Sequence, residues 1–329
     1  MPSKITFVIP AYNASPYIGE ALGSLQAQTV ADWEAVVVDD ASSDDTFALA
    51  SRFAEADPRI RVFQSEERSG SAFMPRMRAV SLAATEWVAP LDADDWLEPS
   101  YLEKMLGMLG KEKADVVFPT IYIVDNDGSR LLSEIPEELR ESSIPGKDCV
   151  AYTLNGWRIH TGGGIISRRL FLDVAEETSR EGVYSCLDEF FIRVLIFKAR
   201  RAAFSGAQYF YRMNGDSVTH RHDITSFDYL RNDRRLLSFT RRFYGEGSEE
   251  FSRANMQVFF GYMNAVLMLS SPGYRHIGSN AVKASAKASL AASCRKKIRK
   301  EAGNKWYLLS FLPLCILKIL FRLRESLRK

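Results

Sequence analysis

The sequence feature that most constrains the fold is an alternation of short apolar runs with helical segments in the first part of the chain. Between these runs, apolar residues recur at helical spacing, as at Ile18, Leu22 and Leu25. Strands that alternate with helices in this way predict an α/β fold with a doubly wound, mostly parallel sheet. The runs expected to form buried strands are 4–10, 33–38, 59–64 and 87–91.

Polar residues follow three of these strands at the point where each strand ends. In sheets of this kind, ligands bind beyond the carboxyl ends of the strands. Asp92 and Asp94 follow the fourth run and point to the same side of an extended segment. Their charges repel unless a cation or hydrogen-bond donors lie between them, and a divalent metal ion that also binds phosphate meets that need. The alternative is a polar turn that caps the next helix.

The composition is that of an ordinary folded protein. The chain has 329 residues, of which 46% are apolar and 26% are charged. Its four cysteines are far apart and form no C-x-x-C pair, which argues against a zinc site or a disulfide framework and favours a reducing compartment. The amino-terminal apolar run ends at Pro10 and is too short for a signal peptide.

Three segments together resemble family 2 glycosyltransferases, which are inverting enzymes with the GT-A fold. The resemblance covers about residues 4–220 and extends, at a finer level, to bacterial enzymes of exopolysaccharide or lipopolysaccharide biosynthesis. The segments that carry it are Val-Ile-Pro-Ala-Tyr-Asn at 8–13, Val-Val-Asp-Asp-Ala-Ser-Ser-Asp-Asp-Thr at 37–46, and Leu-Asp-Ala-Asp-Asp at 91–95.

The resemblance implies a role for each matching residue in binding a UDP-sugar. Asp40 would accept a hydrogen bond from the uracil ring, Asp92 would reach the ribose or the metal, and Asp94 would bind Mn²⁺ or Mg²⁺ that bridges the diphosphate. Arg76 matches an arginine near the base and phosphates, although the Asn that follows it in the family is Met77 here. The nucleoside pocket would be lined by Pro10, Ala11 and Tyr12, and Arg212 would contact the diphosphate.

The same resemblance assigns the catalytic base to Asp188. The family has a Glu-Asp pair before a helix, and here Leu187 replaces the Glu, so Glu189 is the reserve candidate. The alternative is that Asp188 caps this helix. Displacement at the anomeric carbon needs such a base to take the proton of the acceptor hydroxyl. The glycines at 162–164 (Gly162, Gly163 and Gly164) suit a loop close to the sugar or acceptor, or a plain turn.

The carboxyl-terminal part of the chain is strongly basic. From Lys283 to Lys329 there are 13 Lys and Arg residues and 2 acidic residues. The apolar stretch Trp306–Phe321 would span only about 24 Å as a helix, less than the roughly 30 Å of a hydrocarbon core. We therefore expect this tail to lie on an anionic membrane surface. The alternatives are a helix packed on the protein or an oligomer contact. A nucleic-acid partner is disfavoured, because the folded part of the chain shows no face that combines basic and aromatic residues.

Together these observations predict a metal-dependent inverting glycosyltransferase that uses a UDP-sugar and a glycan or lipid-linked glycan acceptor. The alternative is a catalytically impaired, membrane-associated protein that binds sugar nucleotides. A dinucleotide dehydrogenase is excluded because 10–13 reads Pro-Ala-Tyr-Asn where G-x-G-x-x-G would stand. We expect a cytoplasmic protein, peripheral at the inner face of the cell membrane. The expected domains are a GT-A domain at 1–222 with halves at 1–100 and 101–222, a helical extension at 223–302 and the tail at 303–329.

Overall fold

The computed structural model describes residues 5–125, 128, 130–132, 135–154, 163–179, 187–213, 227–269, 280–294 and 298. The strands are β1 (Ile5–Ala11), β2 (Trp33–Asp39), β3 (Ile60–Gln64), β4 (Trp87–Pro90), β5 (Trp96–Leu97), β6 (Val116–Val124), β7 (Arg130–Leu132), β8 (Ser143–Pro145), β9 (Ile165–Ser167) and β10 (Arg201–Arg212). The α-helices are α1 (Ile18–Gln26), α2 (Thr46–Ala56), α3 (Phe73–Leu82), α4 (Tyr101–Glu112), α5 (Gly146–Cys149), α6 (Arg168–Ser179), α7 (Leu187–Lys198), α8 (Tyr229–Tyr244), α9 (Glu249–Met268) and α10 (Asn280–Ala292); the 3₁₀-helices η1 and η2 are Glu137–Leu139 and Val150–Thr153.

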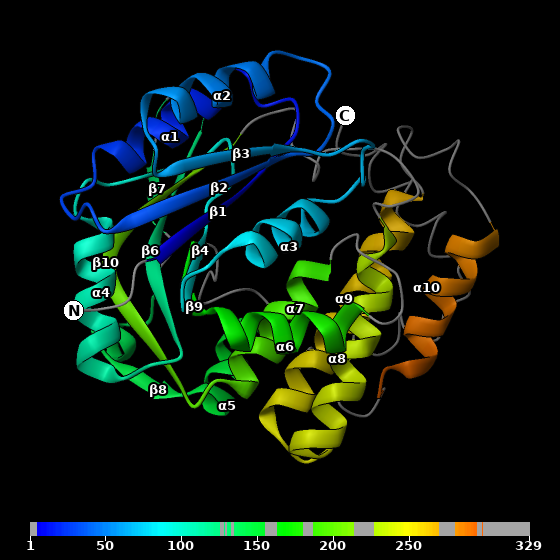
Figure 1. Ribbon diagram of the computed structural model, residues 1–329. Coiled ribbons are helices and arrows are strands. Elements are labelled where there is room, and N and C mark those ends of the chain that lie inside the picture. Colours follow the sequence, from blue (N-terminus) through cyan, green and yellow to red (C-terminus); the bar gives the residue numbers. More distant parts are fainter. Residues whose placement is uncertain are drawn as a thin grey trace. The chain divides into compact units, whose positions relative to one another are not determined.

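The strands form one mixed sheet in the order β3-β2-β1-β4-β9-β6-β10-β5, with β7 paired to β6 and β8 to β10 (Figure 1). The first four strands are parallel, as the sequence predicts. Beyond β4 the direction changes, because β9 runs antiparallel to both β4 and β6, whereas β6 and β10 are parallel to each other. The predicted α/β fold is therefore confirmed, and the parallel strands that it requires lie mostly in the first half.

Helices cover both faces of the sheet. Alternate residues of β1 and β2, including Phe7, Ile9 and Trp33, belong to a core that α1 and α4 complete with side chains such as Leu22 and Met105. Each fully buried side chain of this kind stabilises the fold by about 1.5–3 kcal/mol. The strand residues between them face the other layer, which contains α3, α6 and α7 (Figure 1).

The helices of this second layer meet through aromatic side chains. The ring centroid of Phe191 in α7 lies 5.5 Å from that of Phe73 in α3 and 4.7 Å from that of Phe171 in α6. These inclined ring contacts add about 0.5–1.5 kcal/mol each to the burial of their apolar surface.

An ion pair at the amino-terminal ends of the strands ties several elements together. The carboxylate of Asp57, after α2, accepts hydrogen bonds from the Arg59 backbone N (3.1 Å), Nε (3.0 Å) and Nη2 (2.7 Å), and from Gln26 Nε2 of α1 (3.3 Å). The Arg59 guanidinium also lies 3.9 Å from the ring centroid of Trp33 in β2. The Arg59 side chain lowers the pKa of Asp57 to about 2 by hydrogen bonding to its charged form.

The chain divides into two compact units. One contains residues 1–153 and 157–214, and the other contains 154–156 and 215–329. The second unit has the helical extension that the sequence predicts, with α8, α9 and α10 around a core of residues such as Leu230, Phe259 and Ala286. The predicted boundary after residue 222 and the basic tail at 303–329 lie outside the described residues. In the part of the chain that the structure describes, every helix is too short or too polar to cross a membrane.

We predict that Asp57→Asn lowers the free energy of unfolding of the first unit by about 1–2 kcal/mol at pH 7, because it removes a charge-assisted pair. The pKa of Asp57 is about 2 in the folded protein and 3.8 without these contacts. Its contribution is therefore complete above about pH 4 and is lost as the pH falls through about 2. Urea unfolding should show the difference between wild type and variant shrinking over that range.

The neighbouring exposed carboxylate of Asp32 provides a matched control. Asp32→Asn should change the free energy of unfolding by less than about 0.5 kcal/mol. An equal loss in both variants would show that general charge, and not the pair with Arg59, causes the effect.

Candidate functional site

The parallel strands place the predicted nucleotide residues at one edge of the sheet. β1 lies between β2 and β4, with Ala11 paired to Asp39 and Val8 paired to Pro90. Tyr12, Asp40 and Asp92 follow the carboxyl ends of these strands, so the three residues emerge side by side. Pro10 and Ala11 end β1 at the same edge.

Reciprocal hydrogen bonds hold the loops after β1 and β2 against each other. Asn13 Oδ1 accepts from Ser43 N at 2.9 Å, and the Asn13 N donates to Ser42 Oγ at 2.9 Å. Asn13 and Ala41 have positive φ angles of 49° and 55°, a conformation that is costly for residues other than glycine. Strained backbone of this kind is common in functional loops, and here it occurs in the two loops that carry Tyr12 and Asp40.

The two carboxylates after β2 have different environments. Asp39 is fully buried, and its Oδ2 accepts from Ser42 N (3.1 Å) and Gln64 Nε2 (3.2 Å). It shapes the turn, whereas Asp40 faces the loop after β3. Asp40 is 4% exposed, and its carboxylate accepts from Ser69 N (3.0 and 3.1 Å) and Ser69 Oγ (2.9 Å).

The loop at 65–72 supplies two residues that the sequence predictions omit. Besides Ser69 on Asp40, the guanidinium of Arg68 lies 3.9 Å from the ring centroid of Tyr12. The available signal is position alone, because this loop follows β3, the third parallel strand of the sheet, and must emerge at the same edge as the others.

Arg76 and Asp92 form an ion pair at the centre of the site. Arg76 Nη2 donates to Asp92 Oδ1 at 2.8 Å, from a side chain 13% exposed to one 43% exposed. Arg76 lies on α3, so this pair joins the helix that packs on β1 to the loop after β4. The sequence predictions place both residues at the nucleotide, and the structure brings them into direct contact.

Asp92 and Asp94 are the predicted metal ligands, and their chemistry fits Mn²⁺ or Mg²⁺. Both are partly exposed carboxylates on one short loop. Among the described residues, His, Cys, Asp and Glu form no cluster of three or more suited to a metal ion. Two carboxylates that leave the remaining positions to water and phosphate oxygens are the usual protein contribution for Mg²⁺. The pair therefore suits an ion that arrives with a diphosphate.

Asp95, the third carboxylate of the loop, points into the protein. It is 1% exposed, and it accepts hydrogen bonds from Tyr209 Oη (2.6 Å) and from Arg212 N (2.9 Å). Burial raises the pKa of Asp95 well above its usual value, and the charges of Asp92 and Asp94 raise it further. Asp95 therefore holds the loop to β10.

Arg212, at the end of β10, packs against the same loop. Its Nε donates to the main-chain oxygen of Asp94 at 2.9 Å, and its guanidinium forms an ion pair with Glu20. The guanidinium also lies 4.5 Å from the ring centroid of Trp96 and 5.2 Å from that of Tyr17. Arg212 thus lies beside the predicted metal ligand, supported by two aromatic rings.

Two tyrosines, Tyr209 and Tyr101, contact the glycine loop at Gly163. Gly163 has a φ of +63°, and a Cβ there would lie 2.1 Å from Tyr209 Cδ2. Its carbonyl accepts a hydrogen bond from the hydroxyl of the buried Tyr101. A Cβ on Gly164 would lie 2.9 Å from the Val117 carbonyl oxygen, so both positions require glycine. Gly162 lies outside the described residues.

The predicted catalytic base is on a helix of the same unit. Asp188 is the second residue of α7, but its side chain is outside the described part of the chain. The reserve candidate Glu189 is described, and its Oε2 lies 3.4 Å from Nη1 of the buried Arg193. The Arg193 Nη1 also donates to the Glu189 main-chain oxygen at 2.7 Å, and its Nη2 donates to Thr153 O at 2.7 Å.

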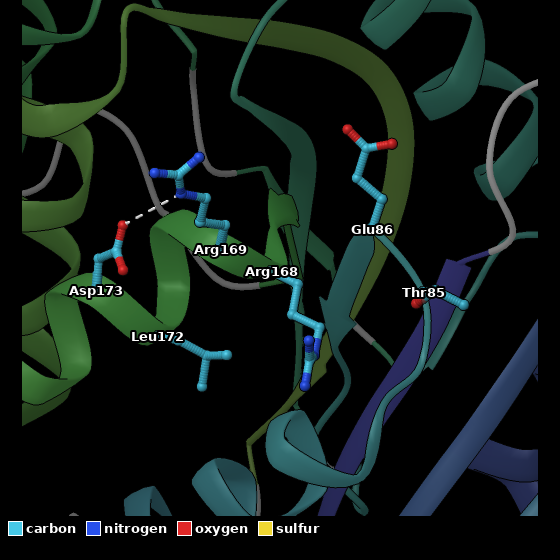
Figure 2. Close-up of a pocket in the computed structure, with 6 residues that line it drawn as sticks. All are labelled: Thr85, Glu86, Arg168, Arg169, Leu172 and Asp173. Atoms are coloured by element: carbon cyan, nitrogen blue, oxygen red, sulfur yellow. Dashed lines mark ion pairs between the residues drawn. The ribbon is translucent and has the colours of Figure 1, made fainter.

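A pocket of about 260 Å³ lies away from these residues (Figure 2). It is lined at the start of β4 by Glu86, whereas Asp92 follows the other end of that strand. Arg168 in this pocket donates to the Val80 and Ser81 carbonyls at the end of α3, and Arg169 pairs with Asp173 at 3.9 Å. Figure 2 shows the Arg168 side chain turned away from that pair. Arg168 thus ties the start of α6 to the end of α3.

The mixed α/β sheet, with carboxylates beyond the ends of its parallel strands, has the GT-A fold. Two crystal structures of Staphylococcus aureus TarS share this fold. One, a complex with UDP-GlcNAc, has a TM-score of 0.65, 19% identity and coverage of 99% of this chain and 91% of that chain. The other has a TM-score of 0.61, 18% identity and coverage of 94% and 89%.

The family model described as glycosyl transferase family 2 matches residues 6–174, so the chain belongs to that family. The succinoglycan biosynthesis protein ExoO of Rhizobium meliloti is 35% identical over 127 residues, which is 39% of this chain and 36% of that protein. Glycosyltransferase GlyG of Streptococcus pneumoniae is 31% identical over 130 residues, 39% of this chain and 43% of that protein. The matches thus span less than half of these relatives. The family prediction is confirmed.

Proposed function

We propose that the protein is an inverting glycosyltransferase that moves a sugar from a UDP-sugar to a hydroxyl of a glycan or lipid-linked glycan. The observation that carries this proposal is the meeting of Asp40, the Arg76–Asp92 pair and Asp94 at the carboxyl ends of parallel strands in a family 2 chain. The complex of TarS with UDP-GlcNAc, and its name as an N-acetylglucosaminyltransferase, support a UDP-sugar donor. The name of ExoO as a succinoglycan biosynthesis protein supports a role in glycan synthesis.

The nucleoside would occupy the space between the loops after β1, β2 and β3. Tyr12 offers an aromatic face, and Asp40 offers a buried acceptor for the N–H of a uracil ring. In the structure Ser69 donates to the Asp40 carboxylate, and the Arg68 guanidinium lies over the ring of Tyr12. A bound base therefore has to displace both residues or bind alongside them, which makes this loop part of nucleotide binding.

The diphosphate end would be formed by Arg76, Asp92 and Asp94. Asp94, with Asp92, would hold Mn²⁺ or Mg²⁺, which when bound would neutralise charge on the departing diphosphate. Arg76, now paired with Asp92, carries a positive charge close to the same place. Arg212 holds the main chain at Asp94 and so would help to position this end of the donor.

The reaction also needs a base for the acceptor hydroxyl, and Asp188 fits this role best. The acceptor oxygen forms a bond to the anomeric carbon, the bond to UDP breaks with its electron pair on the diphosphate, and Asp188 takes the proton. The contact of Glu189 with Arg193 supports this choice, because one oxygen of the reserve candidate's carboxylate already lies 3.4 Å from a guanidinium nitrogen. Leu187 stands where the family has Glu, so the base works here without an acidic neighbour on that side.

Asp188→Asn should lower kcat by about 10²–10⁴-fold, since it removes general-base catalysis. Glu189→Gln is the matched control and should stay within about threefold of wild type because its carboxylate serves Arg193. Release of UDP is measured with Mn²⁺, a panel of UDP-sugars and an acceptor extract, and Asp94→Ala tests the donor end in the same assay.

The outcomes of this assay separate the alternatives. Full transfer by Asp188→Asn would overturn the base assignment, and loss in Glu189→Gln alone would move that role to Glu189. A wild type that binds UDP but releases none from any donor would favour the catalytically impaired sugar-nucleotide binder. A wild type that does not bind UDP would refute both.

Ser69→Ala should tighten UDP binding by about threefold, because one hydrogen bond to Asp40 no longer has to be broken. The backbone N–H of Ser69 remains, so the gain is limited. Isothermal titration with UDP measures the change, and Ser65→Ala in the same loop is the control, with Kd unchanged. Weaker binding by Ser69→Ala would mean that the hydroxyl contacts the nucleotide and does not compete with it.

The basic tail at 303–329 is proposed to hold the protein on an anionic membrane surface, at the inner face of the cell membrane, near a lipid-linked acceptor. Deletion of 303–329 should abolish most binding to vesicles that contain anionic lipid, because these basic and aromatic residues supply the attraction. Cosedimentation with anionic and with neutral vesicles measures this. Unchanged binding after deletion would refute the role of the tail.

A further inference from the structure

The hydroxyl of Tyr209 connects parts of the site that are far apart in the chain. Tyr209 is in β10, is 3% exposed, and donates to Asp95 Oδ2 at 2.6 Å. Its oxygen accepts from the backbone N of Asp92 at 3.3 Å. A phenol has one donor hydrogen and can accept as well, so both bonds form together. They hold the loop 92–95 at its first and last residues.

The ring of Tyr209 contacts a second loop. It lies so close to Gly163 that a Cβ there would be 2.1 Å from Cδ2 and 2.5 Å from Cε2. The Gly163 carbonyl accepts a hydrogen bond from the Tyr101 hydroxyl. The ring therefore fixes the spacing between the glycine loop and the carboxylate loop, because neither can move towards the other through a buried aromatic ring.

We propose that Tyr209 is a positioning residue for sugar transfer, which sets the place of the 92–95 loop relative to the Gly163 loop. The inference rests on the proposed function, in which the first loop holds the diphosphate end of the donor and the second approaches the sugar or acceptor. Tyr209 touches neither reactant in this arrangement. It acts through Asp95 and the main chain at Asp92.

The contribution of such a residue should appear in turnover more than in binding. Asp92 is also held by Arg76, so the donor can still bind when Tyr209 loses its hydroxyl. The alignment of donor and acceptor depends on the distance between the loops, and reaction rates are far more sensitive to small misplacements than binding is. The expected signature is therefore a fall in kcat with little change in KM.

Tyr209→Phe tests this, because it keeps the ring against Gly163 and removes both hydroxyl bonds. The matched control is Tyr229→Phe in α8, whose hydroxyl likewise makes two hydrogen bonds: it donates to the Gly261 carbonyl (3.0 Å) and accepts from Asn264 Nδ2 (3.5 Å). Two measurements are made on the full chain: hydrogen exchange of peptides covering 91–97 and 163–167, and steady-state UDP release with varied donor.

We expect Tyr209→Phe to speed exchange in the 91–97 peptide about tenfold and to leave the 163–167 peptide unchanged, because the ring stays against Gly163. It should also lower kcat about 10- to 30-fold, with KM for the donor within threefold. Tyr229→Phe should leave exchange in these peptides unchanged and kcat within about twofold. The double variant Asp95→Asn with Tyr209→Phe should have a kcat no more than about threefold below that of the poorer single variant. The reason is that both changes disrupt the same hydrogen bond between Tyr209 and Asp95.

Unchanged exchange of the 91–97 peptide in Tyr209→Phe would overturn the proposal, and so would faster exchange there with unchanged kcat. A rise in KM as large as the fall in kcat would assign Tyr209 to donor binding instead. A wild type without turnover would count against the proposed function, and the exchange data alone would then decide whether the Tyr209 hydroxyl holds the 92–95 loop.

Discussion

The parallel register of β1 between β2 and β4 is the constraint on which the site depends. Ile5 pairs with Trp33 on one side and with Trp87 on the other, so the three strands begin in register. A shift of one residue in any of them would turn its buried side chains to the opposite face. The cores on both faces therefore fix the register, and the register fixes which residues emerge together at the edge. The position of Asp40 relative to Asp92 follows from packing of side chains far from either.

The three carboxylates of the 92–95 loop show how the fold accommodates concentrated negative charge. Three acidic groups so close together repel one another, and each has a different environment that lowers this cost. Asp92 pairs with Arg76, Asp95 is buried with two hydrogen-bond donors and a raised pKa, and the main chain at Asp94 is held by Arg212. The Arg76 pair is exposed enough on the Asp92 side for a ligand to compete for it.

Much of the fold follows from local sequence, because buried parallel strands and amphipathic helices have distinct periodicities. The four leading strands and their order along the chain are predictable in this way. The mixed second half is not, since β5, β8 and β9 are only 2 or 3 residues long and are too short to show a period. Their positions depend on pairing partners far away in the chain.

The location of the candidate site was predictable in the same way. Asp40, Asp92 and Asp94 stand directly after strands, so their meeting could be inferred from topology and from the family resemblance. Ser69 on Asp40 and Tyr209 on Asp95 could not, because their partners lie 29 and 114 positions away in the chain. Side-chain contacts at that separation depend on the path of loops and on the bulge in β10, which leave no local pattern.

The Asp57–Arg59–Trp33 cluster lies at the amino-terminal ends of the strands, so it stabilises the fold at a distance from the candidate site. Its hydrogen bonds and stacked guanidinium join α1, α2, β2 and β3 without approaching the loops that bear Tyr12 or Asp94. A protein built in this way can accumulate substitutions in the loops at the carboxyl ends of its strands, while contacts at the amino-terminal ends maintain its stability. Evolution or engineering can thus change donor or acceptor preference at one end of the strands and raise thermal stability at the other.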